Sequence, residues 1–186
     1  MRVFRLSVTL QDVQPRVWRQ IDLSPELSLA QLHGIIQAAF GWQDYHLHEF
    51  EAGGLRYGDP TQADGELDLR DERLVSLAEM LRKPGDGFRY DYDLGDGWEH
   101  TVVLDGVLEP DPAVRYPHCV AGGNACPPED CGGPDGYAEL CEAMADPAHP
   151  ERAALIHWLG GEFDPEQFSL SKVNRALTRV TRRRRA

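Results

Sequence analysis

The sequence predicts a single α+β domain with a largely antiparallel sheet. Two pairs of segments that alternate apolar and polar residues, within residues 3–23 and 88–104, indicate two strand hairpins. One long amphipathic helix follows the first pair, and helical segments close the chain after residue 136. Strands grouped apart from helices are typical of the α+β class. With 186 residues, of which 41% are hydrophobic, the chain can bury one sizeable core.

The N-terminal third predicts a hairpin followed by the long helix. Apolar residues alternate along Val3–Leu10 and again along 17–23, as expected for two half-buried strands that pair with each other. Ser28 is a good N-cap for residues 29–40, whose apolar side chains recur at helical spacing. Gly41 can adopt the left-handed conformation that ends a helix.

The middle of the chain predicts short elements around a second hairpin. The segment "YHLHEF" (45–50) is a short alternating strand, and a polar stretch leads from it to a short helix over 74–81. The segment "FRYDYDLGD" (88–96) alternates strongly, and "GDGW" turns it into a strand over 99–104.

The C-terminal part predicts a long loop followed by three helices. Residues 109–136 are rich in Pro, Gly and Cys, which favours irregular structure, and a loop of this length is often functional. Helices are expected over 137–145 and 151–159. The last helix should begin at "DPEQF", where Asp164 suits the N-cap and Pro165 the first helical position. Its expected buried stripe is Phe168, Val173, Leu177 and Val180.

The sequence indicates a cytoplasmic location. No run of about 18 apolar residues is present, so no segment is expected to span a membrane. The N-terminus "MRVFRLSVTLQ" lacks the apolar block and cleavage site of a signal peptide. The glycine-rich "AGGNA" lacks the lysine and the strand-to-helix context of a phosphate loop, so we expect no nucleotide cofactor.

Charge is distributed unevenly along the chain. Six of the 19 basic residues are arginines from Arg175 onward, where no acidic residue occurs, so the first 174 residues carry 13 basic and 31 acidic groups, a net charge of −18. Such an acidic body disfavours binding to nucleic acid. The terminal arginines Arg182, Arg183, Arg184 and Arg185 could contact nucleic acid or an acidic partner, or form a solvated helix end.

Several unusual motifs occur in one order: "LHGIIQAAFGW", "YHLHEF", "YDYDLGDGWEH", "ACPPEDCGG" and "FDPEQF". Together they resemble the plasmid pRiA4b ORF-3-like family, found on bacterial chromosomes, plasmids and mobile elements. The resemblance covers nearly the whole chain. It implies one domain of its own α+β type over residues 1–186, with a short basic tail at about 181–186, and it implies little about activity. A mobile-element accessory protein that contacts nucleic acid through this tail is one functional alternative.

Two histidines on the segment 45–50 are candidate metal ligands. His46 and His48 are two residues apart on an expected strand, so both imidazoles would share a face and could bind one ion. Alternatively, they form a hydrogen-bonded pair packed beside Phe50. His100, which begins a strand directly after Trp98, is a further ligand candidate.

The second hairpin gathers acidic groups. Asp91, Asp93, Asp96 and Glu99 lie within ten residues of one another, together with His100. Carboxylates at this density can form a hard-cation site or an acid/base pair, with Asp96 as a catalytic candidate. Acidic groups near a turn also cap backbone N–H groups, which is the structural alternative.

The loop containing "ACPPEDCGG" offers thiols beside acids. Cys119, Cys126 and Cys131 have the spacing C-x6-C-x4-C, which differs from the C-x2-C knuckle of zinc ribbons. Three thiolates and a histidine can still enclose zinc in a tetrahedron. The alternatives are a structural loop, in which Glu129 and Asp130 cap backbone amides, and a reactive thiol.

The favoured function from the sequence is a binding or interaction module whose partner is a protein or a small molecule. Its Cys/His/acid loop is either stabilised by zinc or purely structural. The alternative from another class is a metal-assisted hydrolase. Its metal ligands would be His46, His48 and His100, and its base Glu129 or Asp130. A hydrolase requires these segments to converge in space.

Overall fold

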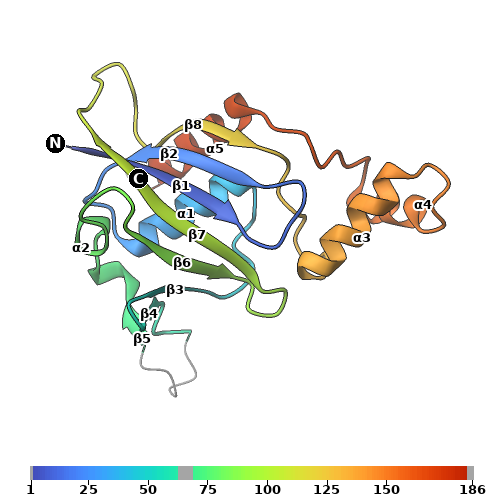
Figure 1. Cartoon of the computed structure of the whole chain (residues 1–186), viewed down its shortest axis with the longest axis horizontal. Coiled ribbons are helices and arrows are strands. Elements are labelled where there is room, and N and C mark those ends of the chain that lie inside the picture. Colours follow the sequence, from blue (N-terminus) through green and yellow to red (C-terminus); the bar gives the residue numbers. More distant parts are fainter. Residues whose placement is uncertain (1, 63–68, 184–186) are drawn as a thin grey trace.

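The structure, a computed structural model, describes residues 2–62 and 69–183, with side chains through Val180. One mixed sheet of eight strands runs in the order β5-β4-β3-β6-β7-β1-β2-β8 (Figure 1). All neighbouring strands are antiparallel except β4 and β5, which are parallel. The strands are β1 Val3–Leu10, β2 Trp18–Leu23, β3 His48–Ala52, β4 Leu55–Gly58, β5 Leu69–Asp71, β6 Gly87–Tyr92, β7 Trp98–Leu108 and β8 His118–Gly123. The expected single α+β domain with a largely antiparallel sheet is confirmed.

Two helices pack together against the sheet. Helix α1 contacts the last helix, α5, and α5 also contacts β8 (Figure 1). Helices α3 and α4 lie to one side, beyond the ends of the strands. The helices are α1 Leu29–Phe40, α2 Leu77–Met80, α3 Gly133–Ala145, α4 Arg152–Leu159 and α5 Leu170–Arg183, with one 3-10 turn, η1 Glu72–Leu74. No helix in the described part of the chain is long and apolar enough to cross a membrane.

The N-terminal hairpin and helix form as the sequence predicts. β1 and β2 pair along their length, and alternate residues of β1 are buried in one hydrophobic cluster with the apolar face of α1. Ser28 and Gln31 form a reciprocal capping box at the start of α1. Gly41 ends the helix at φ 93, the left-handed region that glycine adopts without steric cost.

Strands β4, β5 and β8 were not predicted. β4 and β5 lie in the segment expected to be only polar, and β8 lies in the loop expected to be irregular over 109–136. β8 pairs with β2, about 100 residues earlier in the chain. The residues around β8 in the sequence therefore do not by themselves indicate a strand. The Asn174 side chain of α5 accepts from the backbone N–H of Cys119 and donates to the carbonyl of Cys119, which satisfies this part of the outer edge of β8.

The predicted start of the last helix at Asp164 and Pro165 is wrong, because α5 begins at Leu170. The Pro165 carbonyl accepts from the backbone N–H of Ala125, so it is used outside a helix. Asp164 instead forms a short turn, with its carboxylate accepting from the Glu166 N–H. The expected helix over 74–81 is likewise reduced to η1 and the single turn of α2.

Arg19 joins several parts of the fold. Its buried guanidinium donates to the carbonyls of Trp18, Ala39, Gly123 and Asn124. It therefore connects β2, the C-terminal end of α1 and the end of β8 through one side chain. Because the loop containing Cys126 follows directly after Asn124, Arg19 fixes where that loop begins.

Candidate metal centre

Three loops converge on the imidazole of His46. His46 lies just before β3, Asp93 in the turn between β6 and β7, and Glu129 and Asp130 in the loop between β8 and α3. The Nε2 atom of His46 is 2.9 Å from Asp130 Oδ1, 3.5 Å from Asp93 Oδ2 and 3.9 Å from Glu129 Oε2. The histidine segment, the acidic hairpin and the cysteine-containing loop thus meet at one place.

The turn between β6 and β7 orients Asp93. This residue is in the left-handed region at φ 53, and its backbone N–H donates to the Leu47 carbonyl. Its Oδ1 accepts from the backbone N–H groups of Gly95 and Asp96, at 3.1 and 3.2 Å. The other oxygen, Oδ2, faces His46. The turn therefore holds one carboxylate oxygen and presents the second to the cluster.

Glu129 is held in a similar way by two other segments. Its Oε1 accepts from the Gln43 backbone N–H at 2.7 Å and from the Tyr92 hydroxyl at 3.1 Å. The Tyr92 hydroxyl in turn accepts from the Tyr45 backbone N–H. Burial raises the pKa of Tyr92, and the nearby Glu129 carboxylate raises it further, so the hydroxyl stays protonated as a donor. Glu129 Oε2 faces His46.

The loop between β8 and α3 is fixed against the hairpin turn. Asp96 Oδ2 accepts from the Gly132 N–H, so this carboxylate, a catalytic candidate in the sequence, serves to dock the loop. Gly133 lies so close to the turn that a Cβ atom there would be 2.5 Å from the Asp96 carbonyl oxygen, and its φ is +70. The Trp42 indole donates to the Pro127 carbonyl from the other side. The double glycine of "ACPPEDCGG" thus permits the close approach that brings Asp130 to His46.

The cluster has the donors and the geometry of a cation site. The Nε2 atom of His46 is buried and makes no aligned hydrogen bond, although Asp130 is only 2.9 Å away. One ligand atom from each of His46, Asp93 and Asp130 lies within 4.8 Å of the other two. One imidazole nitrogen and carboxylate oxygens are ligands for first-row divalent metals. The Asp130 side chain is 66% exposed, so the cluster is open to solvent on its side.

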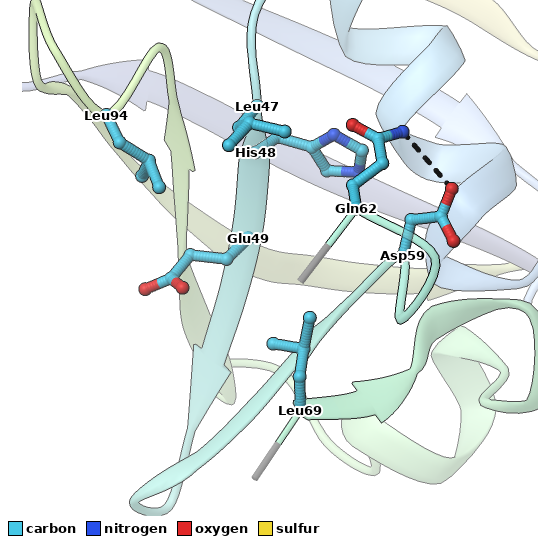
Figure 2. A pocket seen from close by; sticks show the side chains of 7 residues that line it. All are labelled: Leu47, His48, Glu49, Asp59, Gln62, Leu69 and Leu94. Carbon is cyan, nitrogen blue, oxygen red and sulfur yellow. Dashed lines mark hydrogen bonds between the residues drawn. The ribbon is translucent and has the colours of Figure 1, made fainter. Parts of the chain in front are cut away.

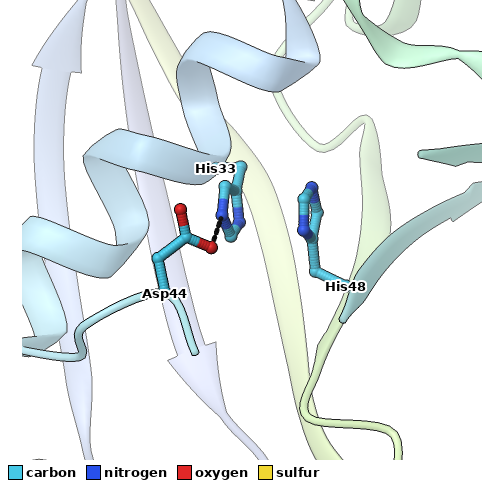
Figure 3. A group of neighbouring side chains, drawn as sticks. All are labelled: His33, Asp44 and His48. Carbon is cyan, nitrogen blue, oxygen red and sulfur yellow. Dashed lines mark hydrogen bonds and ion pairs between the residues drawn. The ribbon is translucent and has the colours of Figure 1, made fainter. Parts of the chain in front are cut away.

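A second group of potential ligands, formed by His33, Asp44 and His48, has a different geometry (Figure 3). The rings of His33 and His48 stack with centroids 3.5 Å apart and planes 6° apart. Lone pairs of stacked imidazoles lie in parallel planes and cannot both point at one ion between them. His33 pairs with Asp44 and Tyr90, and His48 Nε2 pairs with Glu72, each at 2.8 Å.

These contacts indicate a packed polar network. Burial lowers the pKa of His33, which the hydrogen bond to Asp44 partly offsets. His46 and His48 were expected to share a face, either as ligands of one ion or as a hydrogen-bonded pair beside Phe50. The structure instead places them in separate groups, because His46 precedes β3 and only His48 belongs to the strand. His48 also lines a small cavity of about 40 Å³ with Leu47, Glu49, Asp59, Gln62, Leu69 and Leu94 (Figure 2).

His100 lies in the core and away from both groups. It has no exposed surface, its Nδ1 lies 3.2 Å from the Tyr90 carbonyl and 3.1 Å from the Trp98 carbonyl, and Phe40 and Trp42 pack edge-on against its ring. Burial lowers its pKa to about 3. The structure therefore does not bring His100 to the ligands with which the sequence grouped it.

The cysteines are also separated from the two ligand groups. Neither group found among the described residues contains Cys119, Cys126 or Cys131. Cys119 is fully buried on β8, where its thiol contacts the Ala121 carbonyl. Burial raises the pKa of Cys126 and of Cys131, in the latter case to about 12, so neither is a ready thiolate. A zinc site built from these thiols stays a prediction.

The structure does not describe the side chains of the four terminal arginines, Arg182, Arg183, Arg184 and Arg185. The backbone of α5 continues through Arg183. Nucleic-acid contact through these residues stays a prediction.

Sequence reasoning found three of the four residues at the centre as site candidates. Asp93 was recognised only as part of the acidic hairpin, and its signal was the Asp-Leu-Gly-Asp-Gly turn, which can hold a carboxylate by backbone N–H groups. His33 and Asp44 were not noticed. Two polar residues on the largely apolar face of residues 29–40, His33 and Gln37, were the available signal for His33.

The fold and the convergent loops define an α+β domain with a His/Asp/Glu cluster at the meeting point of three turns. The family model for plasmid pRiA4b ORF-3-like proteins matches residues 2–172, and the chain belongs to this family. The uncharacterized protein y4hQ of Sinorhizobium fredii is 39% identical over 177 residues, covering 94% of this chain and 90% of that protein.

A solved structure has the same fold. The crystal structure of the protein of unknown function MM3350 from Methanosarcina mazei Go1 matches with a TM-score of 0.82 and 35% identity, over 91% of this chain and 96% of that one. The names of both relatives specify no activity. These relatives share the fold of this chain.

Proposed function

We propose that the protein is a divalent-metal-binding domain. His46, Asp93 and Asp130 are the ligands, and Glu129 lies beside them. The observation that carries the proposal is the buried His46 Nε2 atom, which makes no aligned hydrogen bond while carboxylate oxygens from two other loops lie within 4.0 Å. Three carboxylates held this close repel one another, and a cation relieves that repulsion.

The donor set favours a first-row divalent ion such as zinc. Zinc accepts imidazole nitrogen and carboxylate oxygen at about 2.0–2.2 Å, and a tetrahedral ion with these bonds holds its ligand atoms about 3.3–3.6 Å apart. The 3.5 Å between His46 Nε2 and Asp93 Oδ2 fits this spacing, and the 2.9 Å to Asp130 Oδ1 would widen slightly to admit the ion. Calcium and magnesium prefer oxygen ligands alone, so the imidazole argues for a transition metal. The backbone N–H contacts to Asp93 supply the outer hydrogen bonds that orient a metal ligand, and the Tyr92 hydroxyl holds Glu129 beside the ligands.

The test is elemental analysis of the full chain, followed by titration with zinc and with cobalt. We expect about one ion per chain in the parent protein. His46→Ala and Asp93→Asn should lose it, whereas His157→Ala, at an exposed position on α4, should keep it.

Two further variants separate this centre from a thiolate site. Cys126→Ser and Cys131→Ser should retain the ion. Loss of the ion from the serine variants, with retention in His46→Ala and Asp93→Asn, would refute the proposed centre. Failure of the parent protein to bind any tested ion would refute it as well.

A further inference from the structure

We propose that this metal centre hydrolyses neutral amides or esters that carry an apolar group, with Glu129 as the general base. This inference rests on the proposed metal site and adds the reaction and the substrate class. It follows from the open side of the centre, the position of Glu129, the charge of the cluster and the apolar side chains around it.

The centre leaves room for water and substrate. Three protein ligands leave at least one position open in a tetrahedral ion, which is the arrangement of catalytic rather than structural zinc. The His46 Nε2 atom is buried and the Asp130 side chain is 66% exposed, so the open position would face solvent on the Asp130 side. Bound water at such an ion ionises near neutral pH.

Glu129 is placed to move the proton. Its Oε2 is 3.9 Å from His46 Nε2, farther than the nearest oxygens of Asp93 and Asp130, so it lies beside the ligands. Gln43 and Tyr92 hold its other oxygen. Glu129 takes a proton from the bound water as the water oxygen bonds to the carbonyl carbon. The bond to the leaving nitrogen or oxygen then breaks, and the proton on Glu129 passes to that atom.

The charge of the centre discriminates between substrates. Ionised Asp93, Glu129 and Asp130 with a neutral imidazole and a doubly charged ion carry about −1 in total, by simple charge counting. The whole chain carries −12. A phosphate ester or a second carboxylate near the reacting bond would be repelled, whereas a neutral carbonyl would not.

Apolar side chains flank the ligands. Tyr45 and Leu47 adjoin His46 in sequence, and Leu94 follows Asp93; these three are 65%, 46% and 52% exposed. Leu47 and Leu94 line the same small cavity from two different loops, and none of the proposed ligands lines it (Figure 2). Three exposed apolar side chains directly adjacent in the chain to two of the ligands offer apolar surface within reach of a bound substrate. They would bind the apolar group of the substrate.

The experiment uses the zinc- or cobalt-loaded full chain and four probes: nitrophenyl hexanoate, the matching nitroanilide, the nitrophenyl hemisuccinate and nitrophenyl phosphate. We expect metal-dependent turnover of the hexanoyl compounds, with kcat/KM at least about tenfold above that of the hemisuccinate, and no turnover of the phosphate. Glu129→Gln should keep the ion and lose about 100-fold or more in kcat. Leu47→Ser and Leu94→Ser should raise KM more than they lower kcat.

The outcomes separate the two proposals. Metal-loaded protein that turns over none of the probes overturns the hydrolytic inference and leaves the metal site intact. Preference for the phosphate overturns the substrate class. Loss of the ion from Glu129→Gln makes Glu129 a ligand and overturns its role as base. His157→Ala should behave as the parent protein in every assay.

Discussion

The imidazole of His100 lies in the core with no exposed surface, and burial lowers its pKa to about 3. In the unfolded chain the same group has a pKa of about 6.5. Between these two values the unfolded state binds one proton more than the folded state, so the free energy of unfolding falls as the pH falls. His100 thus contributes acid sensitivity to the fold.

We predict that His100→Leu weakens this acid sensitivity. Between pH 6.5 and 5 the titration of His100 should remove about 2 kcal/mol of stability from the parent protein, since one proton corresponds to about 1.4 kcal/mol per pH unit. The variant should have a lower free energy of unfolding at pH 7.5, because it loses the ring packing and the contacts to two carbonyls. The free energy of unfolding of the variant should then fall less than that of the parent protein as the pH is lowered. Urea denaturation at several pH values measures both effects, and parallel pH profiles would contradict the assignment.

Tyr92 connects the core to the proposed metal centre. Its ring is fully buried, while its hydroxyl donates to Glu129 and accepts from the Tyr45 N–H. We predict that Tyr92→Phe folds normally and binds zinc within about twofold of the parent affinity, because its partner Glu129 lies beside the ligands. A loss of about ten- to 100-fold, the usual cost of removing an outer hydrogen bond to a metal ligand, would place Glu129 among the ligands. Tyr45→Phe is the matched control, since the Tyr45 hydroxyl donates to the Gln43 side chain outside the ligand set. Competition titration against a chelating dye measures both affinities.

Among the elements, β8 and α5 depend on each other. Asn174 of α5 bonds both the N–H and the carbonyl of Cys119, in the manner of a neighbouring strand. A buried backbone group that loses its partner costs free energy, so this one side chain stabilises both elements.

We predict that Asn174→Ala lowers the free energy of unfolding by about 1–3 kcal/mol, from two lost hydrogen bonds at about 1 kcal/mol each and the unpaired backbone groups that remain. Arg175→Ala, at the next position on the same helix and exposed, should change stability by less than about 0.5 kcal/mol. Chemical denaturation compares the two. Equal effects would show that the Asn174 contacts contribute nothing beyond helix propensity.

Elements determined by near neighbours were predictable from the sequence, and elements determined by distant ones were not. The ends of α1 follow from Ser28, Gln31 and Gly41, all within or beside the helix. The start of α5 depends instead on the Pro165 carbonyl bonding to Ala125, 40 residues earlier. The pairing of β8 with β2 likewise joins residues that are about 100 positions apart in the sequence.

At the scale of the whole molecule, the proposed centre exists only in the folded chain. Its ligands, at positions 46, 93 and 130, are far apart in sequence and meet because the sheet and the docked loop bring three turns together. The residue types were visible in the sequence, but their convergence depends on long-range strand pairing and on the approach of Gly133 to the hairpin turn. For the same reason the sequence grouped His46 with His48 and His100, which the fold separates.

We predict that a saturating metal ion stabilises the protein against heat. An ion that binds the folded state alone, at 100 times its Kd, adds about 2.7 kcal/mol to the free energy of unfolding. For a chain of this size that corresponds to a rise in Tm of about 5–10 °C. Differential scanning calorimetry with zinc and with a chelator measures the change. Asp93→Asn should remove most of the metal-dependent shift, and a full shift in that variant would contradict the ligand assignment.

The position of β1 in the sheet constrains how the protein is made in the cell. β1 is synthesised well before one of its two neighbours, β7, which begins at Trp98. Until β7 and β8 have been synthesised, neither outer edge of the hairpin of β1 and β2 has a partner and its apolar face is only partly covered. Pairings this distant along the chain also make folding slow, because a long loop must close before the contacts form. The nascent chain is therefore prone to aggregate before β7 pairs with β1. Chaperones that bind apolar segments would act during that interval.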